Sequence, residues 1–271
     1  MPNERIGRPS NQSVTKILQL VEILAESKVP MRLQDIIGSV GMPQATCLRY
    51  LNALILEGYA YQDRDSGRYA LTWGVCNLGE KVRAHQSLRS ISSDLINELS
   101  IELGLGICLV IEHEMECVYV DCWYEPASMG VSLMRIGKQS PLHATSSGKI
   151  LLTEYTDAAL DRLIAEKGLA PFTDKTITTK RALVEELETV KRQGYALDNE
   201  ECEEGMRCVA APIYDFTGKV AAAISVFGSS ERITDACIQE EILPTLQWVA
   251  QNISFRMGST FAPQKREIPE N

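Results

Sequence analysis

Four polar residues in one predicted helix have the types and spacing that sequence-specific DNA recognition requires. Gln44, Thr46, Arg49 and Tyr50 follow Pro43 and are expected on the outward face of that helix. Glutamine pairs with adenine and arginine with guanine through two hydrogen bonds, whereas threonine and tyrosine reach phosphate oxygens. Because an α-helix fits the major groove, these residues indicate a recognition helix, although the same pattern also suits an ordinary solvated helix face.

A second group of polar residues suits the binding of a small anion. Thr145 and Ser146 come directly before a predicted helix over residues 147–153, which Ser147 begins. Free amide groups and the helix dipole favour negative charge at such an end, so a carboxylate ligand would fit there. Simple N-capping of the helix by Ser146 or Ser147 is compatible with this function.

Cysteine and histidine residues leave two other kinds of chemistry open. A cysteine-based redox or metal-sensing protein is one, and a zinc site would draw on Cys117, Cys122, Cys202, Cys208 and either His113 or His143. The gaps between these cysteines are not the usual zinc-ligand spacings, and we predict no metal and no cofactor. A Cys/His-dependent enzyme is the more remote alternative, with Cys208 as nucleophile, His143 as base and Asp198 orienting the base. No Gly-x-Ser-x-Gly or nucleotide-binding glycine motif supports catalysis.

The elements around the predicted recognition helix form a winged helix-turn-helix. Apolar residues recur at helical spacing over residues 13–27 and 33–40, and Gly41-Met42-Pro43 makes a tight turn into the third helix, which ends near Gly58. Two short strands, 59–62 and 68–71, flank a turn of turn-forming residues. We therefore place a DNA-binding domain at residues 13–73, with Arg64 and Arg68 beside the wing turn as further DNA contacts.

The segments on either side of this domain are predicted to be an arm and a linker. Residues 1–12 form a polar arm, in which Gly7-Arg8-Pro9 is typical of a minor-groove contact through Arg8, although an idle tail has the same composition. Residues 74–86 read as a linker helix, because Val75, Leu78 and Val82 continue at helical spacing into a polar junction.

Composition and charge restrict the class of protein. A chain of 271 residues with 45% hydrophobic and 23% charged residues is typical of a small globular domain joined to one of ordinary size. Residues 1–83 hold 10 Lys and Arg against 8 Asp and Glu, so the net charge of −9 arises from the remainder. A mildly basic small domain can still bind DNA. With no apolar run of membrane length, no secretory signal and no C-x-x-C pair, we expect a cytoplasmic protein with reduced cysteines and no membrane partner.

The larger part of the chain, residues 87–257, reads as an α+β domain. Helices are predicted over residues 87–103, 147–153, 157–167, 180–193 and 235–256. Strands are predicted over residues 107–112, 118–123, 131–136, 195–199, 208–214 and 220–227. Consecutive strands with helices grouped between and around them favour an α+β fold. Residues 258–271 are polar and are predicted to be a disordered tail.

Several ordered motifs in this chain resemble those of the IclR family of bacterial regulators. They are residues 141–149 (PLHATSSGK), 194–201 (GYALDNEE), 205–215 (GMRCVAAPIYD), 222–226 (AAISV) and 232–234 (RIT). The resemblance covers nearly the whole chain. It implies a GAF-like effector-binding domain, a homodimer or dimer of dimers, double-stranded operator DNA as partner, and control of a nearby catabolic operon.

The resemblance also implies where an effector would bind. Besides the hydroxyl-rich run, it assigns the pocket to Asp198, Met206, Cys208, Ser225 and Phe227. Similar members that bind very small acids carry a second serine where this chain has Phe227. That departure favours a small organic acid with an apolar or ring-like body as effector, although ordinary core packing also accounts for a phenylalanine. We therefore expect a ligand-responsive DNA-binding regulator and not an enzyme.

Overall fold

A computed structural model of the chain describes residues 11–85, 87–124 and 136–260. Contacts within the chain divide it between Gln86 and Ser87 into two compact units. Among the helices of the described residues, none combines the length and the apolar character needed to cross a membrane.

The described residues of the first unit form four helices and a two-stranded sheet. In chain order they are α1 (Gln12–Glu26), α2 (Leu33–Val40), α3 (Gln44–Leu56), β1 (Ala60–Gln62), β2 (Tyr69–Leu71) and α4 (Gly74–His85). Gly41 ends α2 in the left-handed conformation, with φ of 63°, and so allows the sharp turn into α3. The antiparallel pair β1–β2 forms the wing, and Tyr69 also bridges to Met31. The predicted winged helix-turn-helix is confirmed.

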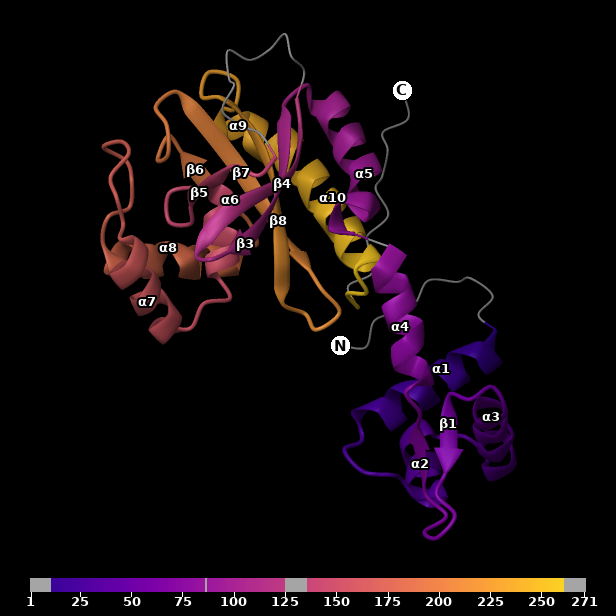
Figure 1. The fold of residues 1–271 in the computed structure, drawn as a ribbon. Coiled ribbons are helices and arrows are strands. Elements are labelled where there is room, and N and C mark those ends of the chain that lie inside the picture. Colours follow the sequence, from indigo (N-terminus) through magenta and orange to yellow (C-terminus); the bar gives the residue numbers. More distant parts are fainter. Residues whose placement is uncertain (1–10, 86, 125–135, 261–271) are drawn as a thin grey trace. The chain divides into compact units, whose positions relative to one another are not determined.

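The second unit is built around a six-stranded antiparallel sheet (Figure 1). Its strands are β3 (Gly106–His113), β4 (Glu116–Trp123), β5 (Gln139–Pro141), β6 (Ala196–Asn199), β7 (Met206–Tyr214) and β8 (Val220–Ser229), in the spatial order β5-β4-β3-β8-β7-β6. Its helices are α5 (Leu88–Leu103), α6 (Ser146–Leu152), α7 (Asp157–Lys167), α8 (Lys180–Gln193), α9 (Asp235–Cys237) and α10 (Leu243–Arg256). The predicted α+β fold is confirmed.

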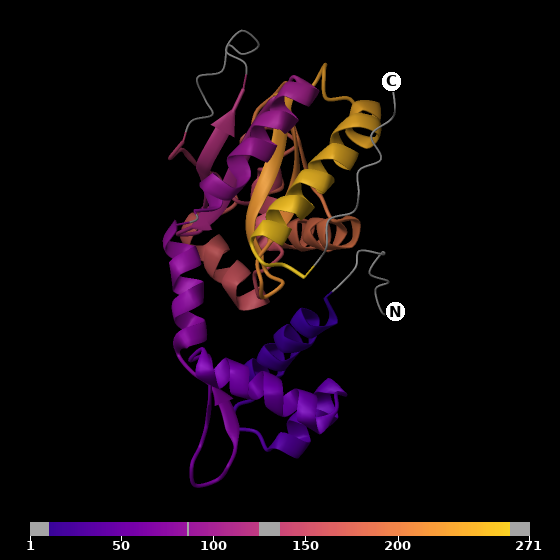
Figure 2. The same ribbon diagram turned by 90° about the vertical axis from the view of Figure 1, so that its right-hand side faces the viewer.

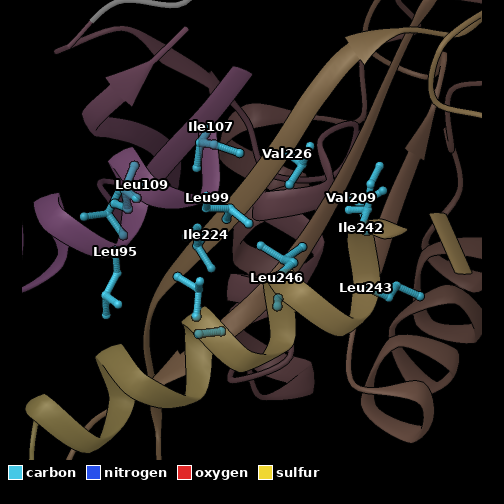
Figure 3. Packing of buried hydrophobic residues seen from close by; sticks show 14 of the residues in the cluster. Leu95, Leu99, Ile107, Leu109, Val209, Ile224, Val226, Ile242, Leu243 and Leu246 are labelled. Atoms are coloured by element: carbon cyan, nitrogen blue, oxygen red, sulfur yellow. The ribbon is translucent and has the colours of Figure 1, made fainter. Parts of the chain in front are cut away.

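Helices cover both faces of this sheet. On one face α5 and α10 lie alongside each other (Figure 2). Their leucines pack onto alternate residues of the central strands, including Ile107, Ile224 and Val226 (Figure 3). The residues between them point to the opposite face, where α6 contacts β7 and β8 and a second apolar cluster forms. Because side chains alternate along each strand, one face of the sheet packs against an apolar core and the other face holds the polar site.

Four details differ from the sequence-based expectations or fall outside the described residues. The expected strand over residues 131–136 lies outside the described residues except for Ile136, which is in a turn, and β5 was not expected. The expected single helix 235–256 contains a π-helical segment, Ile238–Ile242. Pro244 follows it in the first turn of α10 and has no N–H group with which to continue the α-helical pattern. Of the expected tail, residues 261–271 lie outside the described residues, and Ser259 is buried.

Candidate effector site and DNA-reading surface

Two rows of side chains cross the sheet on the face that α6 covers. In one row Cys108 on β3 pairs with Ser225 on β8. In the next row Phe227 on β8 pairs with Cys208 on β7, which pairs with Asp198 on β6. Residues two positions apart on a strand share a face, so the side chains of both rows lie together on this face of the sheet and form the floor of the candidate site.

Phe227 lies over a glycine of the neighbouring strand. Its side chain is 1% exposed, and its register partner on β3 is Gly106. A Cβ atom added to Gly106 would lie 2.2 Å from Cζ of the Phe227 ring. The ring therefore occupies the space that any side chain at position 106 would fill, and the glycine allows the ring to lie flat against the sheet.

A cavity of about 30 Å³ lies between this floor and α6. It is lined by all the residues that the sequence assigned to effector binding: Thr145, Ser146, Ser147, Asp198, Met206, Cys208, Ser225 and Phe227. Six further residues line it as well: Cys108, Tyr119, Lys138, Ser140, Cys202 and Glu203. Ligand pockets usually have volumes of roughly 300–1,000 Å³. Side chains around this cavity must therefore move apart to admit an organic ligand.

The hydroxyl-rich run forms the first turn of α6 and its cap. Thr145 is the N-cap, because its Oγ1 accepts a hydrogen bond from the amide of Gly148 at 3.1 Å and donates one to the carbonyl of Pro141 at 3.0 Å. Capping by Ser146 or Ser147 was therefore the wrong expectation, since the helix begins at Ser146. Both serines are buried beside the cavity, and neither hydroxyl makes a hydrogen bond within the described part of the chain.

A buried lysine on α6 fixes the position of this helix. Lys149 is 1% exposed, and its Nζ donates to Glu201 Oε1 at 2.6 Å, to the carbonyl of Leu197 at 2.8 Å and to Glu186 Oε1 at 3.1 Å. One ammonium group thereby joins α6, α8 and the segment that follows β6. At the neighbouring position of α6, a Cβ atom added to Gly148 would lie 2.2 Å from the carbonyl oxygen of Leu142, so the helix packs directly on backbone there.

Asp198 carries a buried carboxyl group at the edge of the cavity. Its Oδ1 accepts hydrogen bonds from the amides of Glu201 at 2.8 Å and Cys202 at 3.3 Å. Burial raises the pKa of Asp198 to about 7, against the effect of these two amide donors. Burial also raises the pKa of Glu201, although the adjacent Lys149 opposes that shift.

Lys138, Tyr119 and Ser140 form the side of the cavity that sequence reasoning missed. The Nζ of Lys138 lies 5.9 Å from the centre of the Tyr119 ring, and the hydroxyl of Ser140 donates to that of Tyr119 at 3.2 Å. Lys138 forms no salt bridge with any described residue. Its position next to Gln139–Pro141, a strand that the sequence did not predict, explains why no local signal identified it.

The outward face of α3 differs from the expected one at a single position. Gln44 and Arg49 are exposed and Thr46 is partly exposed, as a DNA-reading helix requires. Tyr50 is only 7% exposed and packs in the core of the first unit, so its ring does not lie on the outward face as expected, and its phosphate contact stays a prediction. The guanidinium of Arg49 lies 5.2 Å from the centre of the Tyr50 ring, and this cation–π contact helps to position the Arg49 side chain.

The two wing arginines have different surroundings. Arg64 is exposed in the turn between β1 and β2, where Asp63 holds the turn by accepting hydrogen bonds from the amide and hydroxyl of Ser66. Arg68 is partly buried, and its Nη1 donates to the carbonyl of Pro30 at 3.5 Å. Arg64 is therefore the freer of the two to reach DNA. Arg8 lies outside the described residues.

The residues of the hypothetical Cys/His enzyme are not assembled. The Nε2 atom of His143 is 3.0 Å from the carbonyl oxygen of Ala170, and its ring makes a tilted contact with the ring of Phe172. His143 lines a separate cavity of about 260 Å³, whereas Cys208 lines the one beneath α6. The structure therefore places His143 and Cys208 at different cavities.

The cysteines do not form a metal-ligand cluster in the described residues. All eight are free thiols, and no group of three or more Cys, His, Asp or Glu side chains there has metal-binding geometry. Burial raises the pKa of Cys117 to about 12 and of Cys202 to about 11, so both remain protonated at neutral pH.

Family models match both units of the chain. A model described as "Bacterial transcriptional regulator IclR C-terminal" matches residues 80–255, and one described as "IclR helix-turn-helix domain" matches residues 13–64. The chain is also 32% identical over 228 residues to the HTH-type transcriptional regulator XynR of Escherichia coli K12, covering 84% of this chain and 90% of that relative.

Solved structures show the same fold. The IclR protein of Thermotoga maritima superposes with a TM-score of 0.60 and 27% identity, covering 91% of this chain and 99% of that one. A double mutant of the inducer-binding domain of PobR from Acinetobacter, in complex with 3-hydroxybenzoic acid, superposes with a TM-score of 0.58 and 29% identity. That match covers 62% of this chain and 98% of the PobR domain.

The raised pKa of Asp198 predicts a pH-dependent stability. The folded protein holds a proton up to about pH 7, whereas an unfolded aspartate releases it near its ordinary pKa of 3.8. Stability contributed by this proton is present below the unfolded pKa and is lost as pH rises toward 7. Between pH 5 and pH 7.5 the wild type should lose about 2 kcal/mol more free energy of unfolding than Asp198→Asn, which keeps the Oδ1 acceptor.

Urea denaturation of both proteins at these two pH values measures this difference. Other titrating groups, such as His143, contribute equally to the two proteins, so their effect cancels. Equal pH dependence in the two proteins would mean that Asp198 is already ionised at pH 5.

Proposed function

This chain belongs to the IclR family of bacterial transcriptional regulators, and we propose that it controls a catabolic operon in response to a small organic acid with a ring or other apolar body. A ligand-responsive regulator of this family binds operator DNA through its helix-turn-helix and a small molecule through its C-terminal domain. The observation that carries the proposal about the effector is the polarity of the cavity beneath α6.

One side of that cavity suits a carboxylate. Lys138 supplies a cation without a salt-bridge partner among the described residues, and Ser146 and Ser147 supply hydroxyl groups without hydrogen-bond partners there. Charge-assisted hydrogen bonds to a carboxylate are roughly twice as strong as neutral ones. A carboxylate beside the start of α6 would satisfy the two serine hydroxyls and balance the charge of Lys138.

The other side of the cavity suits an apolar or ring-like body. Met206, Cys208 and Phe227 contribute apolar surface, and Asp198 lies across the floor beside Cys208. The ligand carboxylate is placed away from Asp198, whose ionised form would repel it, and Asp198 would instead form a hydrogen bond with a hydroxyl group of the ligand. The structure of the PobR domain with 3-hydroxybenzoic acid, a ring bearing a carboxylate and a hydroxyl, supports an effector of this class.

DNA recognition is assigned to the exposed side chains of α3 and the wing. Gln44 and Arg49 would read base edges, whereas Thr46, Arg64 and Arg68 would contact the backbone or minor groove. Arg8 remains a proposed minor-groove contact. The domain needs a second copy, because one recognition helix contacts too few bases for useful specificity.

A homodimer or dimer of dimers is favoured by apolar side chains exposed on the first unit. Trp73 is 85% exposed, and α4 also exposes Leu78 and Val82 at helical spacing, while α1 exposes Val14 and Leu18. Apolar stripes of this kind are typical of protein interfaces. We propose that they pair with a second subunit and that the protein acts in the cytoplasm, where operator DNA lies.

Arg49→Ala should weaken binding to operator DNA by roughly 1–3 kcal/mol if Arg49 reads a base. The duplex is selected from random DNA with the wild-type protein and used in gel-shift titrations at fixed salt. Arg181→Ala, which removes an exposed cation from α8 in the second unit, is the control and should change affinity little. Unchanged affinity for Arg49→Ala would remove Arg49 from the recognition surface.

Phe227→Ser should weaken ring-bearing acids by roughly 1–3 kcal/mol through lost apolar burial, while favouring smaller, more polar acids. A thermal-shift screen of carboxylic acids, their amides and neutral sugars measures this, with Phe227→Leu as a second variant in case the serine variant does not fold. Phe216→Ser, which alters an exposed phenylalanine outside the cavity, is the control. Stabilisation by neutral compounds alone, or an unaltered response in both Phe227 variants, would contradict the assigned pocket.

A further inference from the structure

Two cysteines of adjacent strands are in direct contact beside the effector cavity. Cys108 on β3 and Cys122 on β4 are register partners, and the thiol of Cys108 donates a hydrogen bond to Cys122 Sγ at a sulfur–sulfur distance of 3.3 Å. Residues directly opposite in an antiparallel pair have Cα atoms about 4.5–5.5 Å apart. This range lies within the roughly 4.4–6.8 Å that disulfides span, so a bond needs no backbone rearrangement.

An irregularity in the sheet places both sulfurs on the same face. The register of β3 with β4 shifts between Leu109 and Val110, so that Val110 pairs with Tyr119 whereas Cys108 pairs with Cys122. Tyr119 and Cys122 consequently both join the apolar cluster on the α6 side, although they lie three residues apart. The shift therefore brings Cys122 next to Cys108.

The two thiols differ in exposure and in acidity. Cys108 is fully buried and lines the effector cavity, whereas Cys122 is only partly buried. The hydrogen bond from Cys108 lowers the pKa of Cys122, while burial raises that of Cys108. Lys138 favours the Cys122 thiolate and Asp121 opposes it. Burial raises the pKa of Cys208, which lines the same cavity, so its thiol is the poorer nucleophile.

We infer that Cys108 and Cys122 are a site of reversible oxidation, at which a peroxide converts the two neighbouring thiols into one disulfide. The Cys122 thiolate attacks a peroxide oxygen, and the O–O bond breaks to give a sulfenic acid and hydroxide, which takes up a proton. The Cys108 thiol then attacks the sulfenic sulfur, forming the S–S bond and releasing water. Two thiols are oxidised, one peroxide is reduced to two waters, and an external dithiol reverses the reaction.

This modification changes the wall of the cavity. Cys108 is the register partner of Ser225, so its sulfur belongs to the floor on which an effector would lie. Disulfide formation shortens the sulfur–sulfur distance from 3.3 Å to about 2.05 Å and removes the thiol hydrogen. Oxidation of the pair therefore alters Cys108, a residue that lines the cavity.

Peptide mapping of the full-length protein tests the inference without an effector. Reduced protein is exposed to hydrogen peroxide, free thiols are alkylated, and the digest is analysed by mass spectrometry. A cross-linked pair of peptides containing Cys108 and Cys122, lighter by two hydrogens and restored by dithiothreitol, is expected as the main product. Alkylated Cys108 and Cys122 beside oxidised Cys76, the exposed reference thiol, would overturn the inference.

Matched variants identify the role of each sulfur. Cys108→Ser, with Cys108→Ala as a second variant in case serine is not tolerated, should leave Cys122 as a sulfenic acid that dimedone traps. Cys122→Ser should leave Cys108 reduced, and Cys208→Ser should still form the cross-link. Loss of the cross-link in Cys208→Ser, or a cross-link from Cys108 to Cys208 in the wild type, would contradict the assignment.

Discussion

A single buried ammonium group holds together the elements that enclose the cavity beneath α6. Removing a lysine from water costs several kcal/mol unless partners and hydrogen bonds compensate. Lys149 has three such partners, on α8, in β6 and in the segment after β6. Glu201 is itself buried, and its second oxygen has no hydrogen-bond partner among the described residues, so the ion pair with Lys149 is its main compensation. The position of α6 therefore depends on the ion pair between Lys149 and Glu201, because removing Lys149 leaves the charge of Glu201 buried without an opposite charge.

The geometry of the cavity follows from this anchor. With Lys149 fixed, the first turn of α6 presents Ser146 and Ser147 toward the sheet, and the amides that follow Glu200 hold Asp198 in place. On the sheet, the ring of Phe227 can lie flat because β3 has a glycine opposite it. Polar and apolar surfaces consequently face each other across a narrow space, as the proposed binding of a ring-bearing acid would require.

Local signals predicted much of this structure, and tertiary packing decided the rest. The bounds of α7 and α8 agree with the sequence-based prediction, because apolar spacing, capping threonines and a final glycine mark both helices. The sequence-based prediction put Tyr50 on the outward face of α3, although its helical spacing from Cys47, Leu51 and Leu54 places it on the buried face. Lys149 and Lys138 carry no local sign of their environment, since a lysine within a helix or after a turn is usually solvated. Their roles depend on contacts with residues that are distant in the sequence.

The stability of Lys149→Met relative to a matched surface variant tests the role of this anchor most directly. Urea unfolding is followed by the fluorescence of Trp123 and Trp248 in a Trp73→Phe background, which reports on the second unit alone. Lys149→Met should lose about 3–5 kcal/mol, because Glu201 and Glu186 keep their charges without a partner. Lys180→Met, which breaks a surface ion pair with Asp157 and Asp161, should lose less than about 1 kcal/mol. Equal small losses in the two variants would contradict the account, because α6 would then be held by apolar packing alone.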